Sequence, residues 1–218
     1  MELYLIRHGQ TTWNAEGRLQ GRTDTELNEN GREAAINYGK TLTGIKFDKV
    51  FASPLKRARE TAELILEAQR EKNGNACDGT GYPDAKSEDE PEIVTDPRLA
   101  EISFGAEEGS YYRDWVKEGN PFGCFFTEPG KYKAPEGGEE IEEVIARTEE
   151  FLKEKIEPLY ETCEKIMIVA HGALNKGLMC YLEGNTKETF WGSGLQKNCE
   201  ADIFEFDGKA WKKAWKKL

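Results

Sequence analysis

The chain contains only two histidines, and both stand in the same local context. His8 and His171 each follow an apolar run that predicts a strand, and each precedes a glycine, in LIRHG and IVAHG. Glycine after histidine lets the backbone turn sharply and approach a ligand closely. Imidazole can act as a nucleophile or as an acid–base group near neutral pH. A single histidine in such a loop is usually structural, but the repeated context indicates one shared pocket.

Two arginines stand beside these histidines by position. Arg7 adjoins His8, and Arg57 lies one helical turn into the segment that begins at Ser53-Pro54. Planar guanidinium groups suit the equatorial oxygens of a phosphoryl group, and free amides at a helix start also attract anions. The alternative for Arg57 is a solvated helix face, because charged residues surround it. The pattern favours phosphoryl transfer through a histidine, for which no metal ion is needed.

Short apolar runs predict the strands that carry these residues. Residues 3–6 and 166–170 are apolar, residues 49–52 are apolar after Lys49, and each run ends where polar residues begin. Residues 92–95 predict a further short strand. The end of the chain predicts a hairpin of residues 201–206 and 209–215 around Asp207-Gly208.

Helical segments separate these strands, and in residues 30–42 the apolar residues recur at helical spacing. Serine before proline also predicts a helix start, with Ser53 as the cap. The expected helices cover residues 30–42, about 55–70, about 139–162 and the segment after His171 through Leu182.

Strands that alternate with helices predict an α/β fold, a three-layer α/β/α sandwich with a mainly parallel sheet. In such sheets, ligands bind beyond the carboxyl ends of the strands. We therefore expect Arg7, His8, Ser53, Arg57 and His171 to lie on one rim of the sheet.

We expect residues 1–218 to form a single domain with two decorations. Residues at about 71–91 lack periodicity and are rich in Gly, Asp, Glu and Pro, which predicts a surface excursion. Residues at about 105–138 place aromatic side chains among Gly and Pro, which predicts an irregular cap. The aromatic residues indicate either a substrate with an apolar or ring-bearing part, or a small aromatic core that holds the cap in place.

The formal net charge of −11 makes the surface as a whole repel nucleic acid and anionic lipid. An anionic ligand must then be captured by a local basic pocket, so the expected partner is a small phosphorylated metabolite.

Five cysteines, an odd number without a CxxC pair, fit reduced thiols in the cytoplasm. The amino terminus shows no secretory signal, and no apolar run is long enough to span a bilayer. No membrane partner is expected, and the sequence leaves open whether the chain forms a homodimer.

Five segments, in order along nearly the whole chain, carry a specific resemblance. They are RHGQTTWNAEGRLQGRTDTELNENG from Arg7, SPLKRARETA from Ser53, RLAEISFGAEEG from Arg98, APEGGEE from Ala134 and VAHG from Val169. The chain resembles the phosphoglycerate mutase-like branch of the histidine phosphatase superfamily, in particular its broad-specificity and alpha-ribazole-phosphatase types. The resemblance implies a phosphoglycerate mutase-like fold with a cap insertion, and a site without cofactor or metal ion.

The resemblance also implies the role of each residue in a phosphate pocket. His8 attacks phosphorus, and Arg7, Arg57 and His171 stabilise the charge of the phosphoryl group. Glu101 protonates the leaving oxygen, and it matches the acid of the family in the pattern L-x-E-x-x-F-G.

Composition alone does not single out this acid, because Glu107 and Glu108 follow closely in the same loop. Only the family match selects Glu101. Further positions match residues that contact the substrate or its phosphate in such phosphatases. Substrate-binding residues are therefore expected at Thr11, Asn14, Gln20 and Gly21, in addition to Arg7, Arg57 and His171.

The expected function is hydrolysis of small phosphomonoesters through a phosphohistidine on His8. A phosphoglycerate mutase is the nearest alternative, but the stretch CFFTEPGKYKAPEGG offers Lys131 and Lys133 where mutases carry paired arginines, so hydrolysis is preferred. A non-catalytic phospholigand-binding module is a remote alternative, because the chain keeps both histidines, both arginines and the acid. A metal site built on two histidines is less favoured still, since no carboxylate or thiol stands at a recognised ligand spacing from either.

Overall fold

The computed structural model describes residues 1–72 and 91–214, and within them six strands form one sheet. The strand order is β3-β2-β4-β1-β5-β6. Strands β1 to β4 are parallel, β5 runs antiparallel to β1, and β6 runs antiparallel to β5. The mainly parallel sheet expected from the sequence is therefore confirmed. The strands are β1 (Glu2–Arg7), β2 (Lys49–Ala52), β3 (Ile93–Thr95), β4 (Lys165–Ala170), β5 (Ala201–Phe206) and β6 (Trp211–Lys213).

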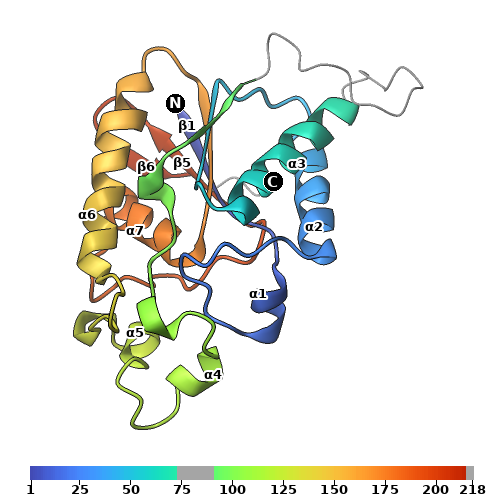
Figure 1. Ribbon diagram of the computed structural model, residues 1–218. Coiled ribbons are helices and arrows are strands. Elements are labelled where there is room, and N and C mark those ends of the chain that lie inside the picture. The colour runs from blue at the N-terminus through green and yellow to red at the C-terminus, as the bar shows by residue number, and fades with distance from the viewer. Residues whose placement is uncertain (73–90, 215–218) are drawn as a thin grey trace.

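Helices cover both faces of the sheet, with α2 and α3 on one side and α6 and α7 on the other (Figure 1). Side chains alternate along the central strand β1, so that Leu3 and Leu5 join the core under α6 and α7, whereas Tyr4 and Ile6 join the core under α2 and α3. The expected three-layer sandwich is confirmed. The helices are α1 (Thr12–Glu16), α2 (Glu29–Thr41), α3 (Lys56–Lys72), α4 (Tyr112–Trp115), α5 (Cys124–Thr127), α6 (Ile141–Phe151) and α7 (Gly172–Glu183), with 3-10 turns at Pro97–Leu99, Gly105–Glu107 and Pro129–Lys131.

The helix expected over about 139–162 is shorter and changes form. It is α-helical over Ile141–Phe151, continues as a π-helical turn over Leu152–Ile156 and ends in a 3-10 turn over Glu157–Leu159. Pro158 lies in this last turn, and proline has no amide hydrogen to bond a carbonyl one turn earlier. The sequence expectation is therefore wrong at the carboxyl end of this helix, because it took residues 139–162 as one continuous helix across Pro158.

The start of α3 also differs from the expectation, because Ser53 is not its cap. The helix begins at Lys56, whose amide donates to Asp24 Oδ1 over 2.7 Å. Ser53 Oγ accepts only a longer bond of 3.3 Å from Leu55 N. It lies instead 2.7 Å from His171 Nε2. The serine at the end of β2 thus belongs to the rim of the sheet, where the two histidines lie.

The segment expected to form an irregular cap, at about 105–138, contains the short helices α4 and α5 and several turns. Figure 1 shows α4 and α5 at one end of the molecule, near α1. Trp115, Phe125 and Tyr132 are buried, and they belong to the same core cluster as Leu3 and Leu5 of β1. Part of the aromatic content therefore packs the cap onto the main core.

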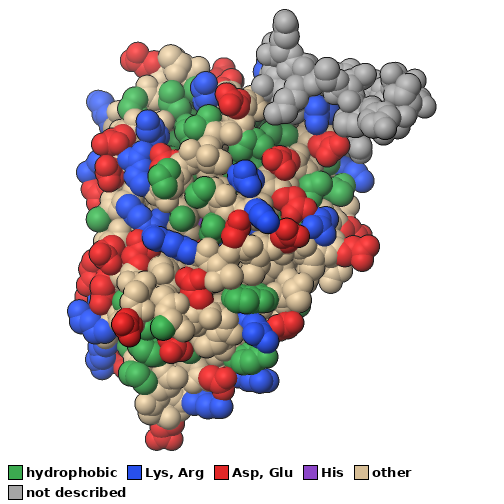
Figure 2. All heavy atoms as spheres, viewed as in Figure 1, with side chains coloured by type: hydrophobic (Ala, Val, Ile, Leu, Met, Phe, Trp, Pro, Cys, Tyr) green, Lys and Arg blue, Asp and Glu red, His purple; other side chains and the backbone are tan. Residues whose placement is uncertain are grey.

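The molecular surface carries many charges of both signs. Figure 2 shows Lys and Arg interspersed with Asp and Glu over the face in view. The excursion expected at about 71–91 lies outside the described residues, apart from residues 71, 72 and 91. In the part of the chain that the structure describes, no helix is both long enough and apolar enough to cross a membrane.

Replacing Phe125 with alanine tests whether the cap is part of the main core. The Phe125 ring is 1% exposed and contacts Phe104 and Tyr132 at centroid distances of 5.3 and 4.8 Å. Removing a buried phenyl ring costs about 3–5 kcal/mol, so the free energy of unfolding in urea should fall by that amount. Val116→Ala is the control, because Val116 is 41% exposed and its truncation should cost less than about 0.5 kcal/mol. A loss below about 1 kcal/mol for Phe125→Ala contradicts a shared core.

Candidate active site

Two adjacent parallel strands bring the histidines together. His8 follows β1 and His171 follows β4, and the pairing continues past the strand ends, where His8 N donates to Ala170 O over 2.9 Å. The two imidazole rings lie with centroids 5.1 Å apart and an interplanar angle of 61°. Both side chains are buried. Segments from opposite ends of the chain thus place two imidazoles within reach of one small anion.

The ring of His8 is oriented by its own backbone. Nδ1 lies 2.6 Å from Gly9 O, and because a carbonyl only accepts, Nδ1 carries the proton and Nε2 carries the lone pair. Asn198 Nδ2 donates to His8 O over 2.9 Å and fixes the backbone at this point. Burial, together with the guanidinium groups of Arg57 and Arg7, holds the pKa of His8 well below its usual value. The free protein therefore presents a neutral imidazole with Nε2 available as a nucleophile.

His171 is held by Ser53. Its Nε2 lies 2.7 Å from Ser53 Oγ, while its Nδ1 is buried and has no hydrogen-bond partner among the described residues. Burial, followed by the positive charge of Arg57, lowers the pKa of His171 well below its usual value. If the Ser53 hydroxyl donates to Nε2, the ring proton stays on Nδ1, the atom without a partner. Sequence reasoning placed Ser53 on the rim but not in the site, although its place directly after β2 is the signal that marks it.

Two guanidinium groups are buried with backbone carbonyls as partners. Arg57 is 1% exposed and donates from Nη1 to Thr23 O over 2.9 Å and from Nη2 to Gly21 O over 2.8 Å. Arg7 Nη1 donates to Gln196 O over 2.5 Å, and Nε of both arginines is buried without a partner in the described part of the chain. Burial lowers the pKa of both side chains, to about 10 for Arg57, so both stay cationic at neutral pH. The site thus holds two positive charges with donors free for an anion.

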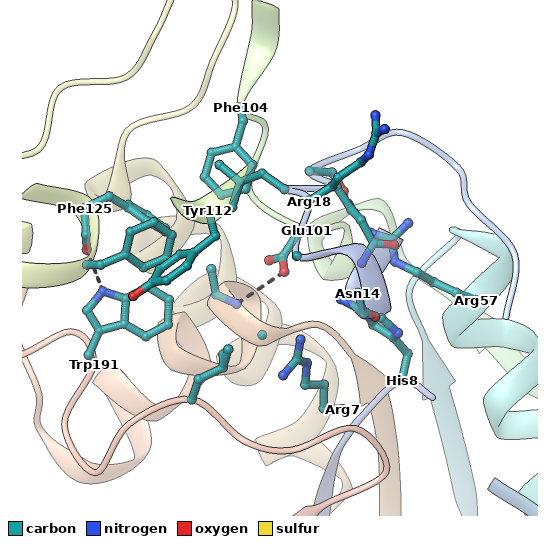
Figure 3. Close-up of a pocket in the computed structure, with 18 of the residues that line it drawn as sticks. Arg7, His8, Asn14, Arg18, Arg57, Glu101, Phe104, Tyr112, Phe125 and Trp191 are labelled. Carbon is teal, nitrogen blue, oxygen red and sulfur yellow. Dashed lines mark hydrogen bonds between the residues drawn. The ribbon is translucent and has the colours of Figure 1, made fainter. Parts of the chain in front are cut away.

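Glu101 lies at the start of α7. Its Oε1 accepts from Leu174 N over 2.8 Å, and its Oε2 accepts from Ala173 N over 3.3 Å. Figure 3 shows the carboxylate between the basic side chains and the aromatic side chains of the site. Of the three carboxylates in this loop, Glu101 lines the cavity of the site, whereas Glu107 and Glu108 do not.

Glu108 supports the site in a way that sequence reasoning missed. Its carboxylate accepts from Arg22 N and Thr23 N, each over 2.8 Å, and from Thr23 Oγ1 over 2.5 Å. These bonds fix the turn whose carbonyls, of Gly21 and Thr23, hold Arg57. Gly21 has a φ of +54°, and a Cβ there would lie 2.2 Å from Glu108 Oε1, so this position requires glycine. Glu108 therefore positions Arg57 through the backbone of this turn.

The expected substrate-contacting residues divide into two groups. Asn14, Gln20 and Gly21 line the cavity, whereas Thr11 does not. The Thr11 hydroxyl caps α1 by accepting from Asn14 N over 3.1 Å, and it donates to Gln20 Oε1 over 2.9 Å. Thr11 is fully buried, so it supports Asn14 and Gln20 from within the protein.

A cavity of about 470 Å³ joins the basic residues to an aromatic region. Figure 3 shows the aromatic rings across the cavity from the basic side chains. Among the described residues, no three or more His, Cys, Asp or Glu side chains are grouped so that they could hold a metal ion. The cavity combines an anion site, a carboxylate and an apolar region. Its lining includes Arg7, His8, Arg57, Glu101, Phe104, Tyr112, Phe125, Phe126 and Trp191.

The chain is similar to known proteins over nearly its whole length. The family model of the histidine phosphatase superfamily (branch 1) matches residues 3–74 and 83–217. A metal-independent phosphoserine phosphatase of Arabidopsis thaliana is 31% identical over 181 residues, which are 81% of this chain and 66% of the relative. This chain therefore spans just under two thirds of that relative.

The chain covers a larger share of other relatives. An adenosylcobalamin/alpha-ribazole phosphatase of Escherichia coli (strain K12) is 28% identical over 203 residues, 93% of this chain and 89% of the relative. A 2,3-bisphosphoglycerate-dependent phosphoglycerate mutase of Bartonella bacilliformis is 30% identical over 188 residues, 85% of this chain and 83% of the relative. Among solved structures, Bacillus stearothermophilus YhfR is 31% identical with a TM-score of 0.79, covering 98% of this chain and 95% of that chain.

The lowered pKa values of both histidines predict that neither ring takes up a proton between about pH 8 and about pH 6 in the free protein. Because the chain has only two histidines, their Hε1 NMR signals can be assigned from His8→Gln and His171→Gln variants. Both signals should stay constant over this range. The unfolded chain does bind these protons, so the free energy of unfolding should fall as the pH drops below about 6.5. A signal that titrates near pH 6.5 contradicts burial as the dominant cause.

Glu108→Gln should weaken anion binding, because glutamine replaces one acceptor by a donor and loosens the turn that holds Arg57. A hydrogen bond to a charged group contributes about 1.5–3 kcal/mol, so the Kd for inorganic phosphate, measured by calorimetry, should rise about tenfold or more. Glu107→Gln is the control and should keep the Kd within about twofold, since the Glu107 carboxylate accepts from Trp115 Nε1 at 3.4 Å and does not contact the turn that holds Arg57.

A double-mutant cycle tests whether Glu108 affects phosphate binding through Arg57 or through a general loss of order in the site. In an Arg57→Ala background, Glu108→Gln should have no further effect on the Kd for phosphate. An undiminished effect in that background contradicts a path through Arg57.

Proposed function

The chain belongs to the histidine phosphatase superfamily, as its motifs predict, and we propose that it is a metal-independent phosphatase that hydrolyses small phosphomonoesters through a phosphohistidine on His8. The observation that carries this proposal is the free Nε2 of a neutral His8 close to three buried donors without partners. These donors are Nε of Arg7, Nε of Arg57 and Nδ1 of His171. These donors can form hydrogen bonds to the oxygens that a phosphoryl group presents around the attacked phosphorus.

In the first step, His8 Nε2 attacks phosphorus in line with the ester oxygen. The N–P bond forms as the P–O bond breaks, and Glu101 gives its proton to the departing oxygen, so that a neutral alcohol leaves. The guanidinium groups and His171 stabilise the charge of the equatorial oxygens. The chain's own residues thus supply the charge stabilisation that many phosphoryl transferases obtain from a metal ion.

In the second step, water replaces the alcohol. Glu101, now ionised, takes a proton from the water as its oxygen attacks phosphorus, and the N–P bond breaks. The products are inorganic phosphate, a neutral His8 and a protonated Glu101, so the enzyme returns to its starting state. In this proposal the alcohol leaves and the water enters beside Glu101, so one carboxyl group serves both steps.

Neighbouring residues orient the reacting groups in this proposal. Ser53 donates to Nε2 of His171 and thereby keeps the proton of that ring on Nδ1, where it can be donated to the phosphoryl group. Asn14, Gln20 and Gly21 contact the substrate because they line the cavity. Thr11 acts indirectly, through its bonds to Asn14 and Gln20.

A phosphoglycerate mutase is the second candidate, since a mutase is among the relatives. A mutase must retain a bisphosphate intermediate, and cations in the cap serve that purpose. Lys131 and Lys133 are not among the residues that line the cavity, and Lys131 Nζ is paired with Glu128 Oε1 at 2.6 Å. This arrangement favours release of phosphate over its return to the substrate.

The cellular setting is also a proposal. The cysteines in the described residues, Cys124, Cys163, Cys180 and Cys199, are unpaired, which fits a cytoplasmic location. The net charge of −11 disfavours nucleic acid as a partner and leaves a small phosphorylated metabolite, captured by the buried arginines.

Turnover of p-nitrophenyl phosphate tests the proposed function. His8→Ala should lower kcat by at least about 10³-fold, because the nucleophile is lost. A circular dichroism spectrum like that of the wild type confirms that the variant folds. EDTA should leave wild-type activity unchanged. Normal turnover by His8→Ala, or activity abolished by EDTA, contradicts the scheme.

The mutase candidate has its own assay. With 3-phosphoglycerate and its bisphosphate primer, the proposed phosphatase should release inorganic phosphate faster than it forms the isomer. Isomerisation faster than phosphate release favours the mutase.

A further inference from the structure

Five aromatic side chains form one side of the cavity, and together they are called the aromatic wall: Phe104, Tyr112, Phe125, Phe126 and Trp191. Phe126 and Trp191 stack with centroids 5.9 Å apart and an interplanar angle of 21°, and Tyr112 meets Phe126 edge to face at 4.7 Å. Trp191 Nε1 donates to Phe125 O over 2.5 Å, and Phe104 and Phe125 are buried. The wall is therefore preformed and anchored in the core.

The wall faces the part of the substrate that leaves. Figure 3 shows its labelled rings across the cavity from His8 and the two buried arginines, with Glu101 between the two groups. In the proposed reaction, Glu101 protonates the leaving oxygen. The rest of the alcohol must then extend from Glu101 toward the aromatic wall.

Two apolar side chains at the cavity are left exposed to solvent. Tyr112 is 47% exposed and Leu195 is 50% exposed, although most large apolar side chains of the chain are buried. A flat apolar group bound against the wall removes this surface from water, and its ring can also stack on the aromatic side chains.

Beyond the phosphoryl site, the cation that lines the cavity already has a carboxylate partner. In the described part of the chain, Arg18 is the one lining cation outside the phosphoryl site. Its Nε forms an ion pair with Glu16 Oε2 at 2.7 Å but no hydrogen bond among the described residues. Its Nη2 donates to Tyr111 OH over 3.0 Å, and its guanidinium lies 4.8 Å from the centroid of the Tyr111 ring. A carboxylate placed here loses hydration against ring faces that carry partial negative charge.

We propose that the aromatic wall makes the site selective for phosphomonoesters whose alcohol carries a flat, uncharged, apolar group, and against those whose alcohol carries a carboxylate. The inference rests on the proposed function, because it needs the phosphoryl group at His8 and the alcohol beyond Glu101. The competing outcome is a carboxylated substrate that draws Arg18 away from Glu16.

Three esters of primary alcohols test this selectivity, so that differences in leaving-group basicity stay small: 2-phenylethyl phosphate, glycerol 3-phosphate and O-phosphoserine. The value of kcat/KM for 2-phenylethyl phosphate should exceed the other two by at least about tenfold. Equal values, or a preference for O-phosphoserine that disappears in Arg18→Ala, overturn the inference.

Substitutions in the aromatic wall test whether the selectivity arises there. Trp191→Ala and Tyr112→Ala should each lower the ratio of kcat/KM for 2-phenylethyl phosphate over glycerol 3-phosphate by about threefold to tenfold. Tyr112 is largely exposed, so its variant keeps the test open if Trp191→Ala does not fold. Tyr160→Ala is the control, because this ring packs on Phe206 at 5.5 Å and does not line the cavity. An unchanged ratio in both wall variants overturns the inference.

Binding separates this inference from the proposed function. Calorimetry with His8→Ala measures the affinity of the three esters without turnover. Tighter binding of 2-phenylethyl phosphate supports the selectivity of the wall, even if the wild type hydrolyses none of the esters, a result that refutes only the phosphatase. Equal or tighter binding of O-phosphoserine overturns the selectivity, even if the wild type is an active phosphatase.

Discussion

The rim of the sheet buries two guanidinium groups that donate to backbone carbonyls, and their positive charge shapes the rest of the site. Burying a charge is costly unless it is hydrogen-bonded, and the carbonyls meet that need only in part. Nε of Arg7 and of Arg57 stays without a partner. The same field, together with burial, keeps His8 and His171 neutral. A bound oxyanion balances the charge and fills the vacant donors at once.

The scaffold makes this cluster by bringing three strand ends to one edge. β1 delivers Arg7 and His8, the neighbouring β4 delivers His171, and β2 delivers Ser53 before α3 supplies Arg57. Backbone groups do much of the positioning, since Gln196 O holds Arg7 and the Glu108-bound turn holds Arg57. The cap closes the opposite side with rings that also belong to the core. The buried arginines and the aromatic side chains therefore form separate regions of one cavity, with Glu101 between them.

Local signals made part of this site predictable. Each histidine follows a buried strand and precedes a glycine, so the sheet edge could be inferred from the sequence. Gln196 and Glu108 could not be inferred, because one acts through its carbonyl and the other through a turn far away in the chain. The helix expected over about 139–162 is α-helical only to Phe151, and Pro158 lies in the 3-10 turn in which the segment ends. Sequence could not divide the aromatic residues of the cap between core and cavity, because only packing makes that division.

The position of the phosphoryl group in the trapped intermediate tests the account most directly. A single turnover stopped in alkali, which preserves phosphohistidine, followed by peptide mapping locates the phosphorylated side chain. The account predicts phosphate on His8, because its Nε2 is the free nucleophilic atom beside Arg7 and Arg57. Phosphate on His171, or turnover without any phosphorylated histidine, would contradict it.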